Sequence, residues 1–291
     1  MKKAIRYAFL FFVAVTIHLT GMEPLSPETL AMLKDMPSIE CMTQIECSLK
    51  TISPDDPRYK RHHVKKEIEK DQLNNEVFQG VSVNWCGYAA IPPVGTVSAV
   101  SGVWIVPTLS SSTINTYSSA WVGMDGYSNG TVEQIGTGHD WVNGAQDNYA
   151  WFEMFPNSMQ EIIGFPVNNS DLIGAIVQYM GNNVFQLSLF NYTANVFTTI
   201  PTALTTSSTA QRTSAEWIAE APSSSQGVLP LAHFGNILFG NCATVINGIY
   251  GPINSPYWFN DPIAMKANNI YKAVPSQLMN NNSFYATWLH E

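Results

Sequence analysis

The sequence predicts an all-β fold, an antiparallel sandwich or barrel, over residues 80–291. Short runs rich in Val, Ile, Phe, Tyr and Thr are separated by Gly, Pro, Asn and Ser, and helix-period patterns are scarce. Several runs alternate apolar and polar residues, which is the period of a half-buried strand. Turn residues at this spacing are typical of antiparallel sheets packed face to face. Examples are SGVWIVPTL, YSSAWVGM, IGAIVQYM and NVFQLSLFNY.

Residues 1–21 have the plan of a secretory signal peptide. Lys2, Lys3 and Arg6 precede the apolar run AFLFFVAVTIHL, and a small residue, Gly21, follows it. The alternative is a membrane anchor, but the apolar run is short for a spanning helix and no stop-transfer pattern follows. We therefore expect a secreted protein that has no membrane attachment after signal cleavage.

Residues 22–79 differ from the rest of the chain in charge and in pattern. They are dense in charges of both signs and contain the helix-compatible stretches PETLAMLKDM and VKKEIEKDQLNNEVF. At their centre lies the basic run RYKRHHVKK, from Arg58 to Lys66. Charge runs of this kind are usually solvated linkers or flexible arms.

The body of the protein is acidic. Residues 80–291 hold three basic residues against eleven acidic ones. Nucleic acid is therefore not expected as a partner, because phosphate binding needs clustered Lys and Arg. A domain with few cations also has little repulsion between like charges once its carboxylates are protonated. The composition therefore suits a protein that works at acidic pH.

Four cysteines in an exported chain suggest disulfides. Cys41 and Cys47 lie close together within residues 22–79, and a bond between Cys86 and Cys242 would tie the first strand of the body to a late one. The alternative is that these residues are free thiols.

Several motifs occur in the order found in one known family. WVGMDG contains Trp121 and Asp125, QIGTG begins with Gln134, YAWFEMFP contains Trp151 and Glu153, and AEWIAE contains Glu216. NWCGYAA, GVWIVP and HFGNILF resemble opening and late strands of the same family. Together these motifs resemble the glutamic peptidase (eqolisin) family over roughly residues 80–291.

The resemblance implies a concanavalin-like sandwich of two large antiparallel sheets, and a secreted, acid-active endopeptidase made as a zymogen. It implies that Gln134 and Glu216 are the catalytic pair. Asp125 and Glu153 match acidic positions that support the pair or line subsites, and Trp121 and Trp151 are expected in the substrate groove. Residues 22–79 become a partly helical propeptide whose cations lie against the acidic body and inhibit it. The substrate is a protein or peptide.

The chemistry of this pair is coherent without the family. A glutamate, with an ordinary pKa near ~4.3, can be ionised at acidic pH and take a proton from water, whereas a histidine base is already protonated there. A glutamine amide does not titrate, so it donates a hydrogen bond to an oxyanion at any pH. The pair needs no metal and no cofactor, and the sequence contains no HExxH, paired CxxC or phosphate loop.

Other chemistry remains as an alternative. Gly126 to Gly130 match the G-x-S-x-G nucleophile elbow, but strand-like sequence rather than a helix follows, so we interpret them as a turn. His139 and His233 are each expected to be structural or surface residues. A carbohydrate-binding or cell-surface sandwich with its many Tyr and Trp residues in a sugar cleft is one alternative function. A glycosidase that uses Glu153 and Glu216 as its two carboxylates is another.

Overall fold

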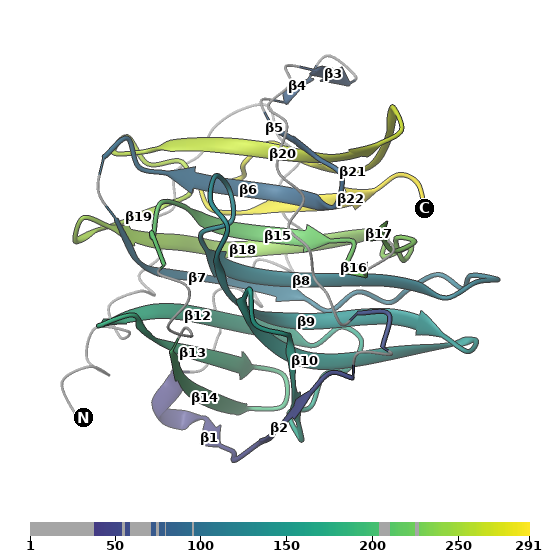
Figure 1. The fold of residues 1–291 in the computed structure, drawn as a ribbon, viewed down its shortest axis with the longest axis horizontal. Helices are drawn as coiled ribbons and strands as arrows, with labels where there is room; N and C mark the ends of the chain where they lie inside the picture. The colour runs from purple at the N-terminus through teal and green to yellow at the C-terminus, as the bar shows by residue number, and fades with distance from the viewer. Residues whose placement is uncertain are drawn as a thin grey trace. The chain divides into compact units, whose positions relative to one another are not determined.

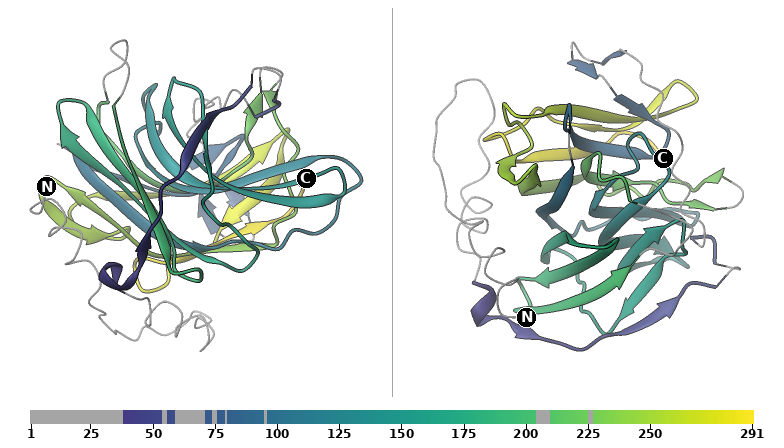
Figure 2. Two further views of the ribbon diagram at one scale, coloured as in Figure 1. Left: turned by 90° about the horizontal axis from the view of Figure 1, so that it is seen from below. Right: turned by 60° about the vertical axis from the view of Figure 1, so that its left-hand side comes forward.

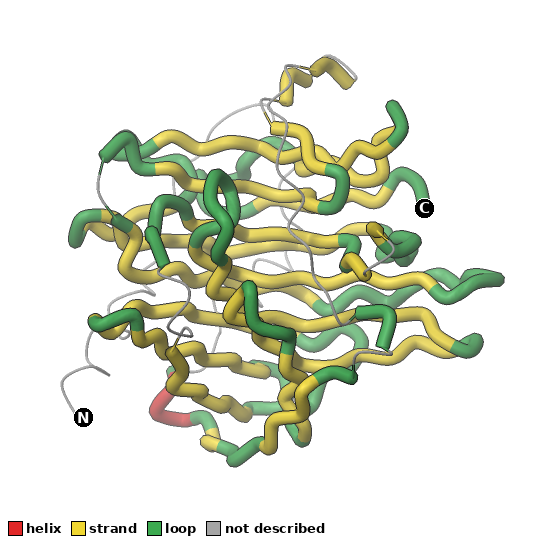
Figure 3. Tube along the Cα trace, viewed as in Figure 1, coloured by secondary structure: helices red, strands yellow, loops and turns green. Residues whose placement is uncertain are grey.

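The computed structural model describes residues 38–53, 56–58, 71–73, 76–78, 80–94, 96–203, 210–224 and 227–291. Within these ranges the regular secondary structure is almost all β-strand, joined by loops and turns (Figure 3), and the one helix is the 3-10 helix η1 (Ile39–Cys41). The all-β class that the sequence predicts is confirmed. Residues 37–291 form one unit by their contacts, and the expected signal peptide lies outside the described residues.

The strands form two layers that pack face to face (Figure 1). Following the hydrogen-bonded pairings, the first layer runs in the order β11 (Gln160–Ile163), β10 (Ala145–Phe155), β9 (Val132–Val142), β8 (Thr116–Met124), β15 (Ala215–Glu220), β6 (Trp85–Ile91), β20 (Phe259–Ala267). The second layer runs in the order β21 (Ile270–Pro275), β22 (Phe284–Trp288), β18 (Asn236–Ile246), β7 (Val97–Ile105), β12 (Leu172–Gly181), β13 (Val184–Asn191), β14 (Val196–Ala203).

Shorter elements complete the fold. They are β1 (Thr43–Gln44), β2 (Ser48–Thr51), β3 (Asp71–Leu73), β4 (Glu76–Phe78), β5 (Gly80–Ser82), β16 (Ser223–Ser224), β17 (Gly227–Val228) and β19 (Ile249–Pro252). Strand β20 pairs with β6 through its first residues and with β21 through its last, so it joins the two layers.

Tight turns connect several neighbouring strands. Asn143 and Gly144 separate β9 from β10, and both have positive φ, 54° and 80°. Asn247 and Gly248 make the same connection between β18 and β19. Two central residues with positive φ define the type I′ turn, whose twist matches that of the strands on either side. The Asn and Gly punctuation of the sequence therefore marks true hairpins.

Residues 43–51 cross from one layer to the other at the edge opposite β20. Strand β1 pairs in parallel with β14, the last strand of the second layer, and β2 pairs antiparallel with β11, the last strand of the first. Figure 2 shows this purple segment running across the sandwich. We call residues 43–51 the strap. The strap covers two sheet edges that otherwise expose unpaired backbone groups.

The first layer has a hydrophobic cluster on each of its faces. The core between the layers contains Trp104, Trp217 and Phe239. A second cluster on the other face contains Trp121, Trp151 and, from the residue that follows the strap, Ile52. Because both faces are covered, β8 and β15 are buried along their whole length.

The helix expected over VKKEIEKDQLNNEVF is wrong where the structure describes that stretch. Asp71–Leu73 and Glu76–Phe78 are strands β3 and β4, and they pair antiparallel. Two asparagines in succession interrupt the helical pattern, and asparagine favours turns over helix interiors. The stretch PETLAMLKDM lies outside the described residues.

The expected disulfides are also wrong, because all four cysteines are free thiols. Cys41 ends the helix η1, and the chain from Thr43 to Ile45 then runs extended along β14 before it reaches Cys47. Cys86 and Cys242 belong to different layers, on β6 and β18. Packed layers lie roughly 10 Å apart. The Trp217 indole of the first layer and the Cys242 sulfur of the second lie next to each other, both against Gly102.

The described residues contain no helix with the length and apolarity needed to cross a membrane.

Candidate active site

Four of the residues that define the site lie in one row across the first layer. In the strand register Glu153 of β10 stands opposite Gln134 of β9, Gln134 opposite Gly123 of β8, and Gly123 opposite Glu216 of β15. Residues directly opposite one another on paired strands point to the same face of the sheet. The register thus brings Glu153, Gln134 and Glu216 to one face, although more than eighty residues separate Gln134 from Glu216.

Gly123 decides how closely the side chains in this row approach one another. A Cβ atom at this position would lie 2.9 Å from Cζ3 of Trp121 and 3.1 Å from Cβ of Gln134. Without it, the Trp121 ring and the Gln134 side chain pack close to the backbone of Gly123. Neighbouring strands lie roughly 4.8 Å apart, so two strand spacings separate the Gln134 and Glu216 backbones by about 10 Å. Side chains of this length can bridge such a gap with one water molecule between them.

Glu153 fixes the orientation of the Gln134 amide. Nε2 of Gln134 donates a hydrogen bond of 2.7 Å to Oε2 of Glu153, and both side chains are buried. An amide group carries two N–H donors and one carbonyl acceptor. One of these donors is bound to Glu153. The carboxyl-bearing side chain of Glu216 is likewise buried.

Trp121 and Trp151 lie in the next row along the same face. Both stand opposite Gly136 of β9, and both are fully buried. A Cβ atom at Gly136 would collide with Trp121. The edge of Trp85 packs against Trp121, with ring centroids 5.1 Å apart. The two tryptophans expected in the groove thus lie on the same face as Gln134 and Glu216, in the neighbouring row.

Glu220 is a buried carboxylate that the sequence analysis did not single out. Its Oε2 accepts a hydrogen bond of 2.8 Å from the Trp121 indole, and its Oε1 accepts one of 3.0 Å from the Asn84 amide. Glu220 lies four residues after Glu216 on β15, so both point to the same face. The sequence AEWIAE could have indicated Glu220, because two glutamates an even number of residues apart on a strand share a face. Glu220 holds the Trp121 indole in place.

Asp125 lies at the end of β8, and its hydrogen bonds go to a neighbouring loop rather than to the pair. Its carboxylate accepts from the backbone N–H of Arg212 at 2.7 Å, from that of Thr213 at 2.8 Å, and from the Asn129 amide at 2.7 Å. Thr213 precedes Glu216 by three residues. Asp125 therefore anchors the segment that leads into the strand of Glu216.

Glu133 faces the core on the opposite side of β9 and is a second carboxyl that the sequence analysis missed. Burial raises its pKa well above the ordinary value, and the neighbouring Asp125 carboxylate raises the pKa further through its charge and a hydrogen bond. Two adjacent carboxyl groups of this kind favour a state in which one of them keeps a proton.

Asp261 extends the row beyond Glu216. On the far side of Glu216, the small residue Ala89 stands opposite both Glu216 and Asp261. The Tyr127 hydroxyl donates a hydrogen bond of 2.7 Å to Oδ2 of Asp261. Burial, followed by the Asp261 charge, raises the pKa of Tyr127, so the phenol stays protonated. Neither residue carried a sequence signal, because only the strand register brings Asp261 beside Glu216.

Ser128 and the two histidines give no second catalytic centre. Ser128 lies in the turn between β8 and β9, and a strand rather than a helix follows it, as the sequence predicts. Nε2 of His139 lies 2.8 Å from the Thr137 hydroxyl in the core, and His233 stacks on Trp288. Among the described residues, no group of three or more His, Cys, Asp or Glu side chains is arranged to hold a metal ion.

Comparison with known proteins gives the same family that the motifs indicate. The Peptidase A4 family model matches residues 83–277. Aspergillopepsin-2 of Aspergillus niger is 27% identical over 203 residues, which cover 63% of this chain and 71% of that protein.

Solved structures of two glutamic peptidases are similar in fold. The crystal structure of scytalido-glutamic peptidase with a transition state analog inhibitor matches with a TM-score of 0.62 and 22% identity, over 71% of this chain and 98% of that one. Aspergilloglutamic peptidase from Aspergillus niger matches with a TM-score of 0.55 and 20% identity, over 60% of this chain and 99% of that one. With the family model matched across most of the sandwich, the chain belongs to the Peptidase A4 family, the glutamic peptidases that its motifs resemble.

Proposed function

We propose that this glutamic peptidase hydrolyses peptide bonds at acidic pH, with Glu216 and Gln134 as the catalytic pair. The observation that carries the proposal is the row in which the two side chains share one face of the sheet on either side of Gly123. One group in this pair titrates and the other does not, and a water molecule and a substrate carbonyl would bind between them.

In the first step, the Glu216 carboxylate takes a proton from the water whose oxygen attacks the carbonyl carbon of the scissile bond. The carbonyl oxygen becomes negatively charged, and the N–H of the Gln134 amide that does not bind Glu153 donates a hydrogen bond to it. Donors of this kind typically contribute ~2.7–4 kcal/mol to transition-state stabilisation. Glu153, bound to the other N–H of the same amide, keeps that donor in position.

In the second step, the tetrahedral intermediate collapses and the bond between carbon and nitrogen breaks. The carboxyl group of Glu216 returns its proton to the leaving amine, which restores the carboxylate. The OH group of the water ends on the new carboxyl product and its other proton on the amine product. No covalent enzyme intermediate forms. The cycle thus needs one proton carrier and one fixed donor.

The row favours this chemistry over glycoside hydrolysis. Glu153 and Glu216 are three strand spacings apart, about 14 Å between backbones, whereas glycosidase carboxyl groups lie ~5–9.5 Å apart. The Gln134 amide also lies between the two glutamates and is bonded to one of them. A sugar-binding cleft is not favoured either, because the Peptidase A4 family model matches residues 83–277.

The burial of the site supports synthesis as a zymogen. Gln134, Glu153 and Glu216 are all buried in the full-length chain, so a substrate cannot reach them without movement of a covering segment. Ile52, next to the strap, packs in the same cluster as Trp121 and Trp151. We propose that residues 22–79 act as an inhibitory propeptide that is released or cut at acidic pH, and that residues 1–21 direct export. Mass analysis of the purified chain after a shift from neutral to acidic pH tests the processing. A catalytically active chain that keeps its full mass contradicts the zymogen.

The catalytic pair is tested by cleavage of denatured casein at acidic pH. Glu216→Gln and Gln134→Ala should each lower kcat by at least about 100-fold while the far-UV circular dichroism spectrum stays that of the folded protein. Gln134→Ala also removes a buried hydrogen bond to Glu153, so its melting temperature should fall. Glu161→Gln, on the neighbouring strand β11 and outside the row, is the matched control and should keep full activity. Retained cleavage in either of the first two variants overturns the assignment.

A further inference from the structure

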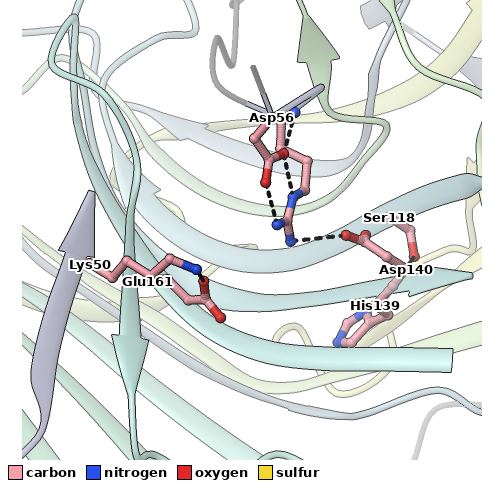
Figure 4. Close-up of polar contacts among 7 residues, drawn as sticks. Lys50, Asp56, Ser118, His139, Asp140 and Glu161 are labelled. Atoms are coloured by element: carbon pink, nitrogen blue, oxygen red, sulfur yellow. Dashed lines mark hydrogen bonds and ion pairs between the residues drawn. The ribbon is translucent and has the colours of Figure 1, made fainter. Parts of the chain in front are cut away.

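Arg58, a few residues beyond the strap, inserts its guanidinium group into a contact with the body of the protein. Nη1 of Arg58 donates to Oδ2 of Asp140 at 3.3 Å, and its Cζ atom lies 4.5 Å from the centroid of the Tyr149 ring. The side chain of Arg58 is 15% exposed and that of Asp140 is 1% exposed. Figure 4 shows Asp56, which precedes Arg58 on the same segment, near Asp140 on the face of the sheet.

On the body, Asp140 bonds to the guanidinium group and the Tyr149 ring lies against it, while Tyr117 and the exposed Asp147 stand beside Asp140 in the strand register. Asp140 of β9 stands opposite Tyr117 of β8 and opposite Asp147 of β10, and Tyr149 follows Asp147 by two residues on the same face. Burial raises the pKa of Tyr117, and the charge of Asp140 raises the pKa further, which reflects how near the two groups are. We call these four residues, Tyr117, Asp140, Asp147 and Tyr149, the Asp140 cradle.

The Asp140 cradle lies on the same face of the first layer as the catalytic row. Gln134 and Asp140 are both on β9, six residues apart, and an even spacing keeps side chains on one face. At about 3.4 Å per residue the separation is roughly 20 Å. An extended peptide bound at Gln134 therefore needs about six residues to reach Asp140.

We propose that the Asp140 cradle is a substrate subsite for a cationic side chain, arginine above all, located about six residues from the scissile bond. The inference rests on the proposed peptidase function and names a substrate preference for the same groove. In the full-length chain Arg58 fills the subsite, and once its segment leaves, the side chain of a bound peptide replaces it.

The contacts of Arg58 explain why arginine suits this subsite. A guanidinium group can pair with a carboxylate through two parallel N–H donors and can also lie over an aromatic ring, which lysine does less well. Asp56, two residues before Arg58, takes both parallel donors, at 2.8 and 2.6 Å, so Asp140 receives a single longer bond. A substrate arginine without such a neighbour offers both donors to Asp140. A buried carboxylate is stabilised by a cation of this kind.

The test uses the full-length protein after acid processing and a set of matched peptides. Each peptide carries one cleavable bond and either arginine or glutamine at five, six or seven residues from it, on either side. At one of these positions we expect arginine to raise kcat/KM about five- to tenfold over glutamine. Asp140→Asn should bring this ratio close to one, while Glu161→Gln, which removes the Lys50 contact outside the cradle, should keep it. A ratio of two rates is insensitive to how much of the variant is active.

A second measurement needs no change to the body of the protein. A synthetic peptide with the sequence of residues 48–58 should inhibit the processed enzyme, and its Arg58→Gln version should inhibit at least about fivefold less well. If neither set of substrate peptides is cleaved, the proposed peptidase function itself fails. If all are cleaved but arginine gives no advantage at any position, or Asp140→Asn keeps the advantage, or the two inhibitors are equal, the subsite alone is overturned.

Discussion

At the scale of single residues, the site depends on a position that has no side chain. Gly123 stands between Gln134 and Glu216 in the strand register, and its lack of a Cβ atom lets the Trp121 ring and the Gln134 side chain approach the backbone there. The motif WVGMDG contains this glycine, but nothing in the motif says which residues lie on either side of it.

Gly123→Ala should therefore lower the activity, whereas Gly130→Ala should not. The new Cβ atom would lie 3.1 Å from Cβ of Gln134 and 2.9 Å from Trp121, so the neighbours must shift. We expect kcat/KM to fall at least about tenfold and the free energy of unfolding to fall by about 1–3 kcal/mol, the usual range for overpacking. Gly130→Ala, where a Cβ atom meets nothing within 4 Å, is the control. Equal activity in the two variants would show that Gly123 does not shape the site.

Glu133 is a residue whose protonation links stability to pH. Its folded-state pKa is raised above the ordinary value, so the folded protein holds a proton that the unfolded chain releases at lower pH. The stability that this proton contributes is fully present below pH ~4 and is lost as the pH rises through the folded-state pKa. Over that window one such group changes the free energy of unfolding by about 1.4 kcal/mol per pH unit.

Glu133→Gln should flatten this part of the pH profile. The amide has the shape of the protonated carboxyl group and does not ionise, so the variant should lose less stability than the wild type between acidic and neutral pH. Denaturant unfolding at a series of pH values measures the difference. Parallel profiles for the two proteins would mean that Glu133 does not titrate in this range.

At the scale of elements, the strap links the two layers and carries Ile52 to the cluster over the catalytic face. The sequence analysis expected residues 22–79 to contact the body through basic charges. The structure adds strand pairing and an apolar anchor to the ion pairs of Lys50 and Arg58. The exposed pair between Lys50 and Glu161 contributes little, whereas the burial of Ile52 contributes more.

Ile52→Ala should weaken the attachment of this segment. A buried isoleucine cut back to alanine typically costs ~2–5 kcal/mol, and each ~1.4 kcal/mol is a factor of ten in an equilibrium constant. At a fixed acidic pH we expect loss of the propeptide, followed by mass spectrometry, to become at least about tenfold faster. Leu49→Ala, in the strap but 47% exposed, should process at nearly the wild-type rate. If Ile52→Ala loses the propeptide at the wild-type rate, Ile52 does not anchor the segment.

At the scale of the whole molecule, burial and strand pairing hold the sandwich together, and disulfides do not contribute. Cys86 and Cys242 are fully buried free thiols on different layers. Burial raises the pKa of both thiols, which makes them poor nucleophiles in the folded state.

A reducing agent should therefore leave the melting temperature unchanged. Alkylation of the unreduced chain in denaturant should modify all four cysteines of the full-length chain, while alkylation of the folded protein should spare Cys86 and Cys242. Intact-mass measurement separates these outcomes. A fall in melting temperature with reductant, or fewer than four modified cysteines in denaturant, would instead indicate disulfide bonds.

The sequence by itself determined the all-β class, the family and several hairpins, such as the one at Asn143 and Gly144. These features depend on local patterns: the two-residue period of a strand, the φ preferences of asparagine and glycine, and short motifs that stay in order. Only the tertiary structure decided that Gln134 and Glu216 face each other across Gly123, that Asp261 and Glu220 join the same face, that Asp125 bonds a loop, and that the thiols stay apart. Each of these depends on the register between strands that are distant in the chain, and a shift of one residue in that register would turn the side chains to the other face.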